Sequence, residues 1–234
     1  MALYDRDYIQ NRSTQGYSQA SEQSQTRISL FIKQTYQLFA ASLLAASAGA
    51  YVGIGMAPAI ASFFWPLVIL QFVLLFGLFA AKKKAGLNVA LLFGFTFLSG
   101  LTLTPLLSSI LGMPGGAGIV ANAFTLTTIA FGGLSVFAMN TKRDFGVMGK
   151  MLFIALIIII AASLINIFFG SPIFQLAIAS MGALVFSGFI LYDTQNIIRG
   201  AYETPIEGAI ALYLDFLNLF VSLLQIFGIL GNRD

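Results

Sequence analysis

Seven stretches of roughly 20 apolar residues dominate this sequence, and each is long enough for a helix to cross about 30 Å of hydrocarbon. The predicted spans are residues 34–54, 59–81, 86–107, 119–139, 150–169, 173–197 and 209–230. Of the 234 residues, 58% are hydrophobic and only 9% are charged. A soluble domain carries about 25% charged residues. We therefore predict an all-α membrane protein, a bundle of seven transmembrane helices.

The amino-terminal residues differ from the rest of the chain. Residues 1–26 are polar and rich in Gln and Ser. They lack the apolar core and small-residue cleavage site of a signal peptide, so we expect none. We predict a disordered polar tail at residues 1–26 and a seven-helix membrane domain at residues 27–234.

The cations are distributed unevenly among the loops. Of the 12 Lys and Arg residues, all but Arg233 lie before the first predicted helix or in the second, fourth and sixth loops. Short cytoplasmic loops retain Lys and Arg, so we expect a cytoplasmic amino terminus and a carboxyl terminus on the far side. Because these cations border membrane spans, topology explains them, and we expect no nucleic-acid partner.

The sequence contains no cysteine and no histidine. This excludes disulfides, thiolate nucleophiles, Ser-His-Asp chemistry and the usual zinc and haem ligands. We expect no cofactor, and any ion binding must depend mainly on carboxylates, hydroxyls and amides.

Two acidic residues, Asp193 and Asp215, lie inside apolar stretches. An ionised Asp near the centre of a membrane helix costs roughly 2.5 to 3.5 kcal/mol on insertion scales, so such a residue indicates function. At 1.5 Å per residue, the two lie about 8 and 9 Å from the cytoplasmic ends of the sixth and seventh helices. Helices joined by a short connection usually pack as antiparallel neighbours, so the two carboxyls can face each other.

Two carboxyls in contact at low dielectric cannot both ionise cheaply, so we expect the pair to share one proton and to form a pH-sensitive cation site. The alternative is that each Asp caps a helix or forms a local hydrogen bond near its helix end.

A polar stripe follows Asp215 along the seventh helix. Asn218, Ser222 and Gln225 recur at intervals of three and four residues, which places them with Asp215 within an arc of roughly 80°. A polar stripe in a membrane helix faces protein or water. The sequence leaves two interpretations open, a path towards the far side and a set of interhelical hydrogen bonds.

Four motifs together resemble a known family. They are GLTLTP at 100–105, TKRD at 141–144, LYDTQNII at 191–198 and LYLDFLNLF at 212–220. The chain resembles the Bax-inhibitor (transmembrane Bax inhibitor motif) family, in particular its bacterial branch, which includes a modulator of an ATP-dependent membrane protease.

The resemblance implies a bundle with the seventh helix central, located in the inner membrane of a bacterium. In some members it implies a pH-dependent calcium leak controlled by an aspartyl dyad. Asp193 and Asp215 match that dyad and would be the calcium ligands. Calcium-leak relatives carry an Arg ten residues after the second dyad Asp, where it can act as a latch, but this chain has Gln225 there.

Three functions remain open at this stage. The first is a passive pathway for calcium or protons, gated at Asp193 and Asp215. The second is modulation of a membrane protease through the tail and the cytoplasmic loops. The third is an intramembrane aspartyl protease, because a Tyr-Asp pair and a second Asp on adjacent helices resemble presenilin-like enzymes. That class expects Gly-x-Gly-Asp where this chain has LYLD at residues 212–215, so we expect no enzyme.

Overall fold

The computed structural model describes the backbone of residues 4–231 and the side chains of residues 25–231. Residues 4–231 form helices joined by short connections and contain no strand. The elements are α1 (Tyr4–Gly55), α2 (Ala57–Ser62), α3 (Phe64–Ala80), α4 (Leu87–Thr102), α5 (Thr104–Leu111), α6 (Gly116–Asn140), the 3-10 helix η1 (Gly146–Met148), α7 (Gly149–Phe169), α8 (Pro172–Ile198) and α9 (Pro205–Gly231). The predicted all-α class is confirmed.

Six helical segments are long and apolar enough to cross a membrane. They are Gln25–Gly55, Leu87–Leu111, Gly116–Asn140, Gly146–Phe169, Pro172–Ile198 and Pro205–Gly231. The remaining predicted stretch, 59–81, corresponds to α2 and the shorter apolar helix α3 of 17 residues. Each of the seven predicted stretches therefore coincides with helix, in agreement with an all-α membrane bundle.

Two predicted spans are interrupted rather than continuous, and a proline explains each break. Pro66 and Pro105 have no backbone N–H to donate to the carbonyl four residues earlier, and the ring crowds that carbonyl. The helix accordingly breaks at Phe63, between α2 and α3, and at Leu103, between α4 and α5. The predicted spans 59–81 and 86–107 are thus each built from two helices that meet at these residues.

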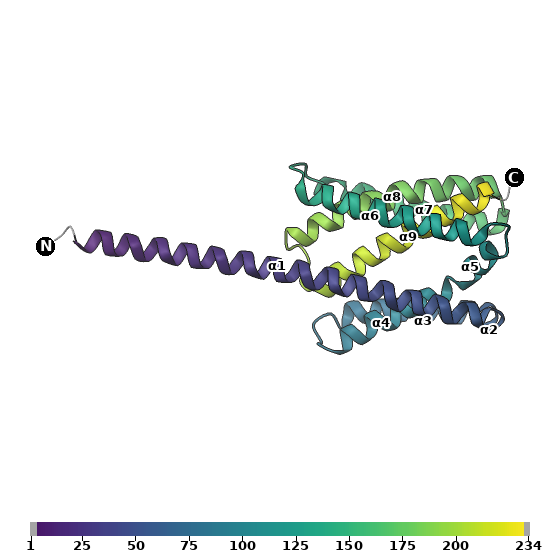
Figure 1. Ribbon diagram of the computed structural model, residues 1–234, viewed down its shortest axis with the longest axis horizontal. Coiled ribbons are helices and arrows are strands. Elements are labelled where there is room, and N and C mark those ends of the chain that lie inside the picture. Colours follow the sequence, from purple (N-terminus) through teal and green to yellow (C-terminus); the bar gives the residue numbers. More distant parts are fainter. Residues whose placement is uncertain (1–3, 232–234) are drawn as a thin grey trace.

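The first helix extends well outside the bundle. Figure 1 shows α1 projecting from one end of the molecule, with its apolar part packed among the other helices. Side chains 1–24 lie outside the described residues. The predicted disorder of the tail at 1–26 falls almost entirely there and stays a prediction.

The last helix, α9, is the centre of the bundle. It packs against α1, α4, α6 and α8, and Figure 1 shows it running between a group formed by α1, α3 and α4 and a group formed by α6, α7 and α8. Nearly half of its residues are buried. The predicted central position of the seventh helix is confirmed.

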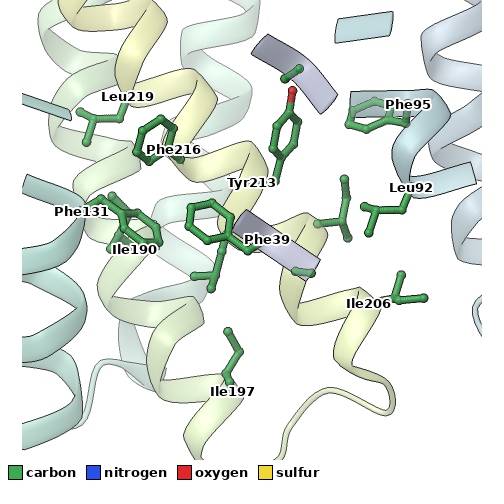
Figure 2. Close-up of a cluster of buried hydrophobic side chains, with 14 of the residues drawn as sticks. Phe39, Leu92, Phe95, Phe131, Ile190, Ile197, Ile206, Tyr213, Phe216 and Leu219 are labelled. Atoms are coloured by element: carbon green, nitrogen blue, oxygen red, sulfur yellow. The ribbon is translucent and has the colours of Figure 1, made fainter. Parts of the chain in front are cut away.

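An aromatic cluster fixes α9 in this position. Figure 2 shows Phe216 beside Phe39 of α1 and Phe131 of α6. The Phe39 and Phe131 rings stack with centroids 4.8 Å apart, and Phe216 meets both edge-on at 5.9 and 5.6 Å. One turn earlier, the hydroxyl of buried Tyr213 hydrogen-bonds to Ser99 of α4. The centre of the bundle is therefore built around α9 side chains.

The outer helices are covered with apolar side chains. Phe76 of α3 and Phe168 of α7 are 68% and 89% exposed, and many Ile and Leu side chains around them are also exposed. Soluble monomers rarely expose contiguous apolar patches of more than a few hundred Å². The surface is therefore suited to lipid, and the chain is a multi-pass membrane protein.

Three loops rich in cations meet at one end of the bundle, which we call the basic end: residues 81–86, 141–148 and 199–204. Lys82 pairs with Glu207 at 2.8 Å and with Glu203 at 3.4 Å. Arg199 pairs with Asp144 at 2.5 Å. The loops predicted to share one side of the membrane are thus joined to one another.

Candidate functional site

Asp193 lies near the end of α8, close to the basic end. Its side chain is buried. Tyr202, in the connection between α8 and α9, donates a hydrogen bond of 2.6 Å from its hydroxyl to Asp193 Oδ1. Asn196 Nδ2 approaches the same oxygen at 3.5 Å. The connection therefore folds back so that a phenol covers this carboxyl.

Asp215 lies on α9 and is also buried. Its carboxyl lies beside that of Asp193, and both line the same cavity. A carboxylate can only accept hydrogen bonds, so a direct hydrogen bond between the two groups would need a proton on one of them. Asp215 Oδ2 is buried and has no hydrogen-bond donor among the described residues. The structure brings the two acidic residues together, as the sequence predicts.

The depth of Asp215 differs from the prediction. α9 begins at Pro205, not at residue 209, so Asp215 lies about 15 Å along the helix. The helix begins earlier because Pro205 suits the first turn, where its missing N–H costs no hydrogen bond. The two carboxyls still meet, because the extra residues 205–208 extend α9 at the basic end, where Glu207 pairs with Lys82.

The dyad opens into a cavity of about 290 Å³, which we call the dyad hollow. It is lined by Phe79, Leu156, Phe186, Phe189, Asp193, Tyr202, Glu207, Ile210, Ala211, Leu214, Asp215 and Asn218. Most of these side chains are apolar, so charge on the dyad is poorly solvated there.

Two further cavities continue along the polar stripe of α9. The middle hollow, about 510 Å³, lies between α7, α8 and α9 and shares Leu156, Phe186 and Asn218 with the dyad hollow. The end hollow, about 820 Å³, lies at the opposite end of the bundle and shares Gln175 and Gln225 with the middle hollow. The three hollows form a row from the basic end to the opposite end.

The members of the stripe differ in their hydrogen bonds. Asn218 donates within its own helix, to the Leu214 carbonyl at 2.7 Å. Ser222 lines the middle hollow. Gln225 accepts a hydrogen bond of 2.8 Å from Gln175 of α8. The stripe therefore both faces the hollows and forms an interhelical hydrogen bond.

Tyr202 and the basic loops define the charge around the dyad. Burial, followed by the neighbouring Asp193 carboxylate, raises the pKa of Tyr202 far above its usual value. Its hydroxyl therefore keeps its proton at physiological pH and remains a donor. The hydrogen bond to Lys83 lowers the pKa of Glu203, with Lys82 adding to the effect.

A permanent metal site is poorly supported by this geometry. Ca²⁺ usually takes six to eight oxygen ligands. The dyad supplies two carboxyl groups, and side chains 25–231 form no cluster of three or more His, Cys, Asp or Glu residues suited to a metal.

Three residues of the site were missed by sequence reasoning: Tyr202, Gln175 and Asn166. Tyr202 gives no signal, because it is an ordinary aromatic residue in a loop. Gln175 and Asn166 are uncharged polar residues within or at the ends of apolar helices. A search for uncharged polar residues within the predicted apolar spans would have found both.

Comparisons with known proteins agree with this architecture. Residues 28–232 match the family described as Inhibitor of apoptosis-promoting Bax1. A protein of Campylobacter jejuni is 61% identical over the whole of both chains. A membrane protein of Vibrio cholerae is 42% identical over 87% of this chain and 91% of its own. The Golgi anti-apoptotic protein of Vaccinia virus is 38% identical over 68% of this chain and 66% of its own. The chain belongs to the Bax inhibitor family.

Proposed function

We propose that this protein is a passive cation pathway in a bacterial inner membrane, with Asp193 and Asp215 as its ion site. The observation that supports the proposal is their position at the head of a row of three hollows. Positive loops favour the cytoplasmic side, so the basic end faces the cytoplasm and the end hollow faces outward.

The chemistry of the dyad suits a site where protons and cations compete. With one proton shared, the two carboxyls bind each other and the pair carries a single negative charge. Loss of that proton leaves two hard, anionic groups in an apolar cavity, which favours a divalent cation such as calcium. The Asn218 amide, which lines both the dyad hollow and the middle hollow, lies next along the row.

Ion flux into liposomes containing the purified full chain tests this proposal. Calcium and proton entry are followed with trapped indicators at several pH values. Asp193→Asn and Asp215→Asn each keep the shape of the side chain and remove one titrating group, so each weakens the pH dependence of flux. The double variant abolishes that dependence and binds calcium poorly.

Circular dichroism and thermal unfolding show whether these variants keep the fold, which buried carboxylates rarely support. Equal flux for wild type and the folded double variant at every pH would remove the dyad from the mechanism.

A second function, modulation of a membrane protease, is favoured by the projection of α1 from the basic end (Figure 1). A helix that projects beyond the bundle offers a partner a surface that the bundle itself does not. This function predicts that deleting residues 1–26 abolishes modulation. It also predicts that the Asp193→Asn, Asp215→Asn double variant modulates the protease fully.

A further inference from the structure

We propose that the hydrogen bond between Gln175 and Gln225 is a neutral gate that closes the row of hollows on the side away from the dyad. The inference rests on the proposed pathway, because it assigns a role to a contact that lies on it. The two amides belong to facing helices, α8 and α9. Gln175 Nε2 donates to Gln225 Oε1 at 2.8 Å.

The position of this bond supports its role as a gate. Gln175 and Gln225 line both the middle hollow and the end hollow, and they are the residues that the two cavities share. A hydrated ion that moves from one cavity to the other must therefore pass between or beside them. Opening requires the two amide groups to separate.

A third amide holds the gate in its closed arrangement. Asn166, near the end of α7, donates from Nδ2 to Gln175 Oε1 at 2.7 Å. Its own Oδ1 accepts from the backbone N–H of Ser171 at 3.2 Å. Gln175 therefore directs its oxygen towards α7 and its NH₂ group towards α9. The chain of amides links three helices at the level where the cavities meet.

The gate is uncharged, so its opening should not respond to pH as the dyad does. The residues that line the middle and end hollows include no Asp, Glu, Lys or Arg within the described part of the chain. Closure at this point cannot depend on titration of a side chain, so the dyad alone carries the response to pH. When the bond opens, two amide oxygens become available as hard ligands for a passing cation.

Cysteine accessibility tests the gate without relying on ion flux. The chain contains no cysteine, so Ser222→Cys places a single thiol in the middle hollow. A small, positively charged, membrane-impermeant methanethiosulfonate is applied to oriented vesicles from the side of the end hollow. The labelling rate measures passage through the gate.

Labelling of the Ser222→Cys protein is slow while the gate is intact. Adding Gln225→Ala raises the rate about tenfold, the change expected from losing one hydrogen bond, and Gln175→Ala, which also loses the bond from Asn166, raises it at least as much. The two Ala substitutions together raise it no further than Gln175→Ala alone, because Gln175→Ala already removes the bond to Gln225. Gln225→Asn, which shortens the side chain and keeps the amide, gives the same direction of change should an Ala variant fail to fold.

The matched control is Gln71→Ala. Gln71 accepts an interhelical hydrogen bond from Thr102 at 2.7 Å and does not line the middle or the end hollow. Its substitution leaves the labelling rate unchanged. An unchanged rate in the folded Gln175 and Gln225 variants would overturn the gate. Faster labelling in these variants without calcium or proton flux at any pH would uphold the gate and overturn the cation pathway.

Discussion

At the scale of single residues, the dyad depends on a residue outside the membrane helices. The hydroxyl of Tyr202 donates a hydrogen bond to Asp193. The raised pKa of Tyr202 means that the hydroxyl keeps its proton and remains a donor. A donor of this kind stabilises the ionised form of the carboxyl that it contacts. Tyr202 is therefore a positioning residue that favours the ionised form of Asp193.

Replacing Tyr202 by Phe removes this donor and keeps the ring. We expect the midpoint of pH-dependent flux to move to higher pH by about one unit, the size of a hydrogen bond to a charged group. Tyr51→Phe is the control, because Tyr51 lies on α1 and is 82% exposed. The assigned role is wrong if both variants titrate like the wild type.

At the scale of elements, α1 and α4 approach each other closely through glycines. A Cβ at Gly100 of α4 would collide with the carbonyl oxygen of Ala46, and a Cβ at Gly49 of α1 would collide with that of Phe97. The obstacles are backbone atoms, which cannot move aside as a flexible side chain can. The two helices can therefore pack at this distance only with glycine at both positions.

Gly100→Ala should therefore destabilise the protein by about 1 to 3 kcal/mol, the usual cost of overpacking a core. Gly132→Ala is the matched control, because a Cβ at Gly132, inside α6, meets no atom within 4 Å. Unfolding in detergent at increasing denaturant compares the two variants. Equal midpoints would show that the α1 and α4 contact tolerates separation.

Ion pairs join the elements at the basic end, and their contribution depends on pH. Arg199 holds the pKa of Asp144 below its usual value, and a hydrogen bond from the Gly146 N–H adds to this. A lowered folded-state pKa means that the stabilisation is present above the unfolded pKa and is lost as pH falls through the folded one.

We expect Asp144→Asn to lower the melting temperature slightly at pH 7, since exposed pairs contribute little. The difference from wild type should shrink as pH falls through the lowered folded-state pKa of Asp144 and vanish once the carboxyl is protonated in both states. Lys84→Gln, which changes charge in a neighbouring basic loop, should show no such convergence. A difference that persists in acid would assign the effect to something other than the ion pair.

At the scale of the whole molecule, the two ends of the bundle differ in character. The basic end carries the ion pairs and the dyad, whereas α9 ends beside the uncharged end hollow. Figure 1 shows the start of α1 and the end of α9 on opposite sides of the bundle. This asymmetry is the arrangement expected of a protein with its cations on the cytoplasmic side.

A reporter enzyme that is active only outside the cytoplasm tests this orientation. It should be active when fused after Asp234 and inactive when fused before Met1 or after Lys84, because these two positions precede or lie in positively charged segments. Activity after Lys84 would reverse the orientation and would place the dyad near the outer surface.

The sequence by itself determined the class of the fold, whereas the central position of the seventh helix was expected only from the family resemblance. Apolar length and loop charge are local properties that follow from the thickness of the hydrocarbon layer, so the seven stretches were readable without coordinates. The meeting of Asp193 and Asp215 was predictable because carboxyls are costly in an apolar helix and helices joined by a short connection pack together. The helix breaks near Pro66 and Pro105 could also have been predicted from the sequence, because proline interrupts a helix. The two stretches were predicted from their apolar length alone.

Only the tertiary structure decided which groups surround the dyad and which side chains bond to the polar stripe of α9. Tyr202 reaches Asp193 because the connection between α8 and α9 folds back, and the amide chain from Asn166 to Gln225 depends on the rotation of three helices. Helix rotation and loop path are set by packing between segments distant in sequence, such as the contacts of Phe216 with Phe39 and Phe131. Hydropathy and spacing within one segment carry no information about them.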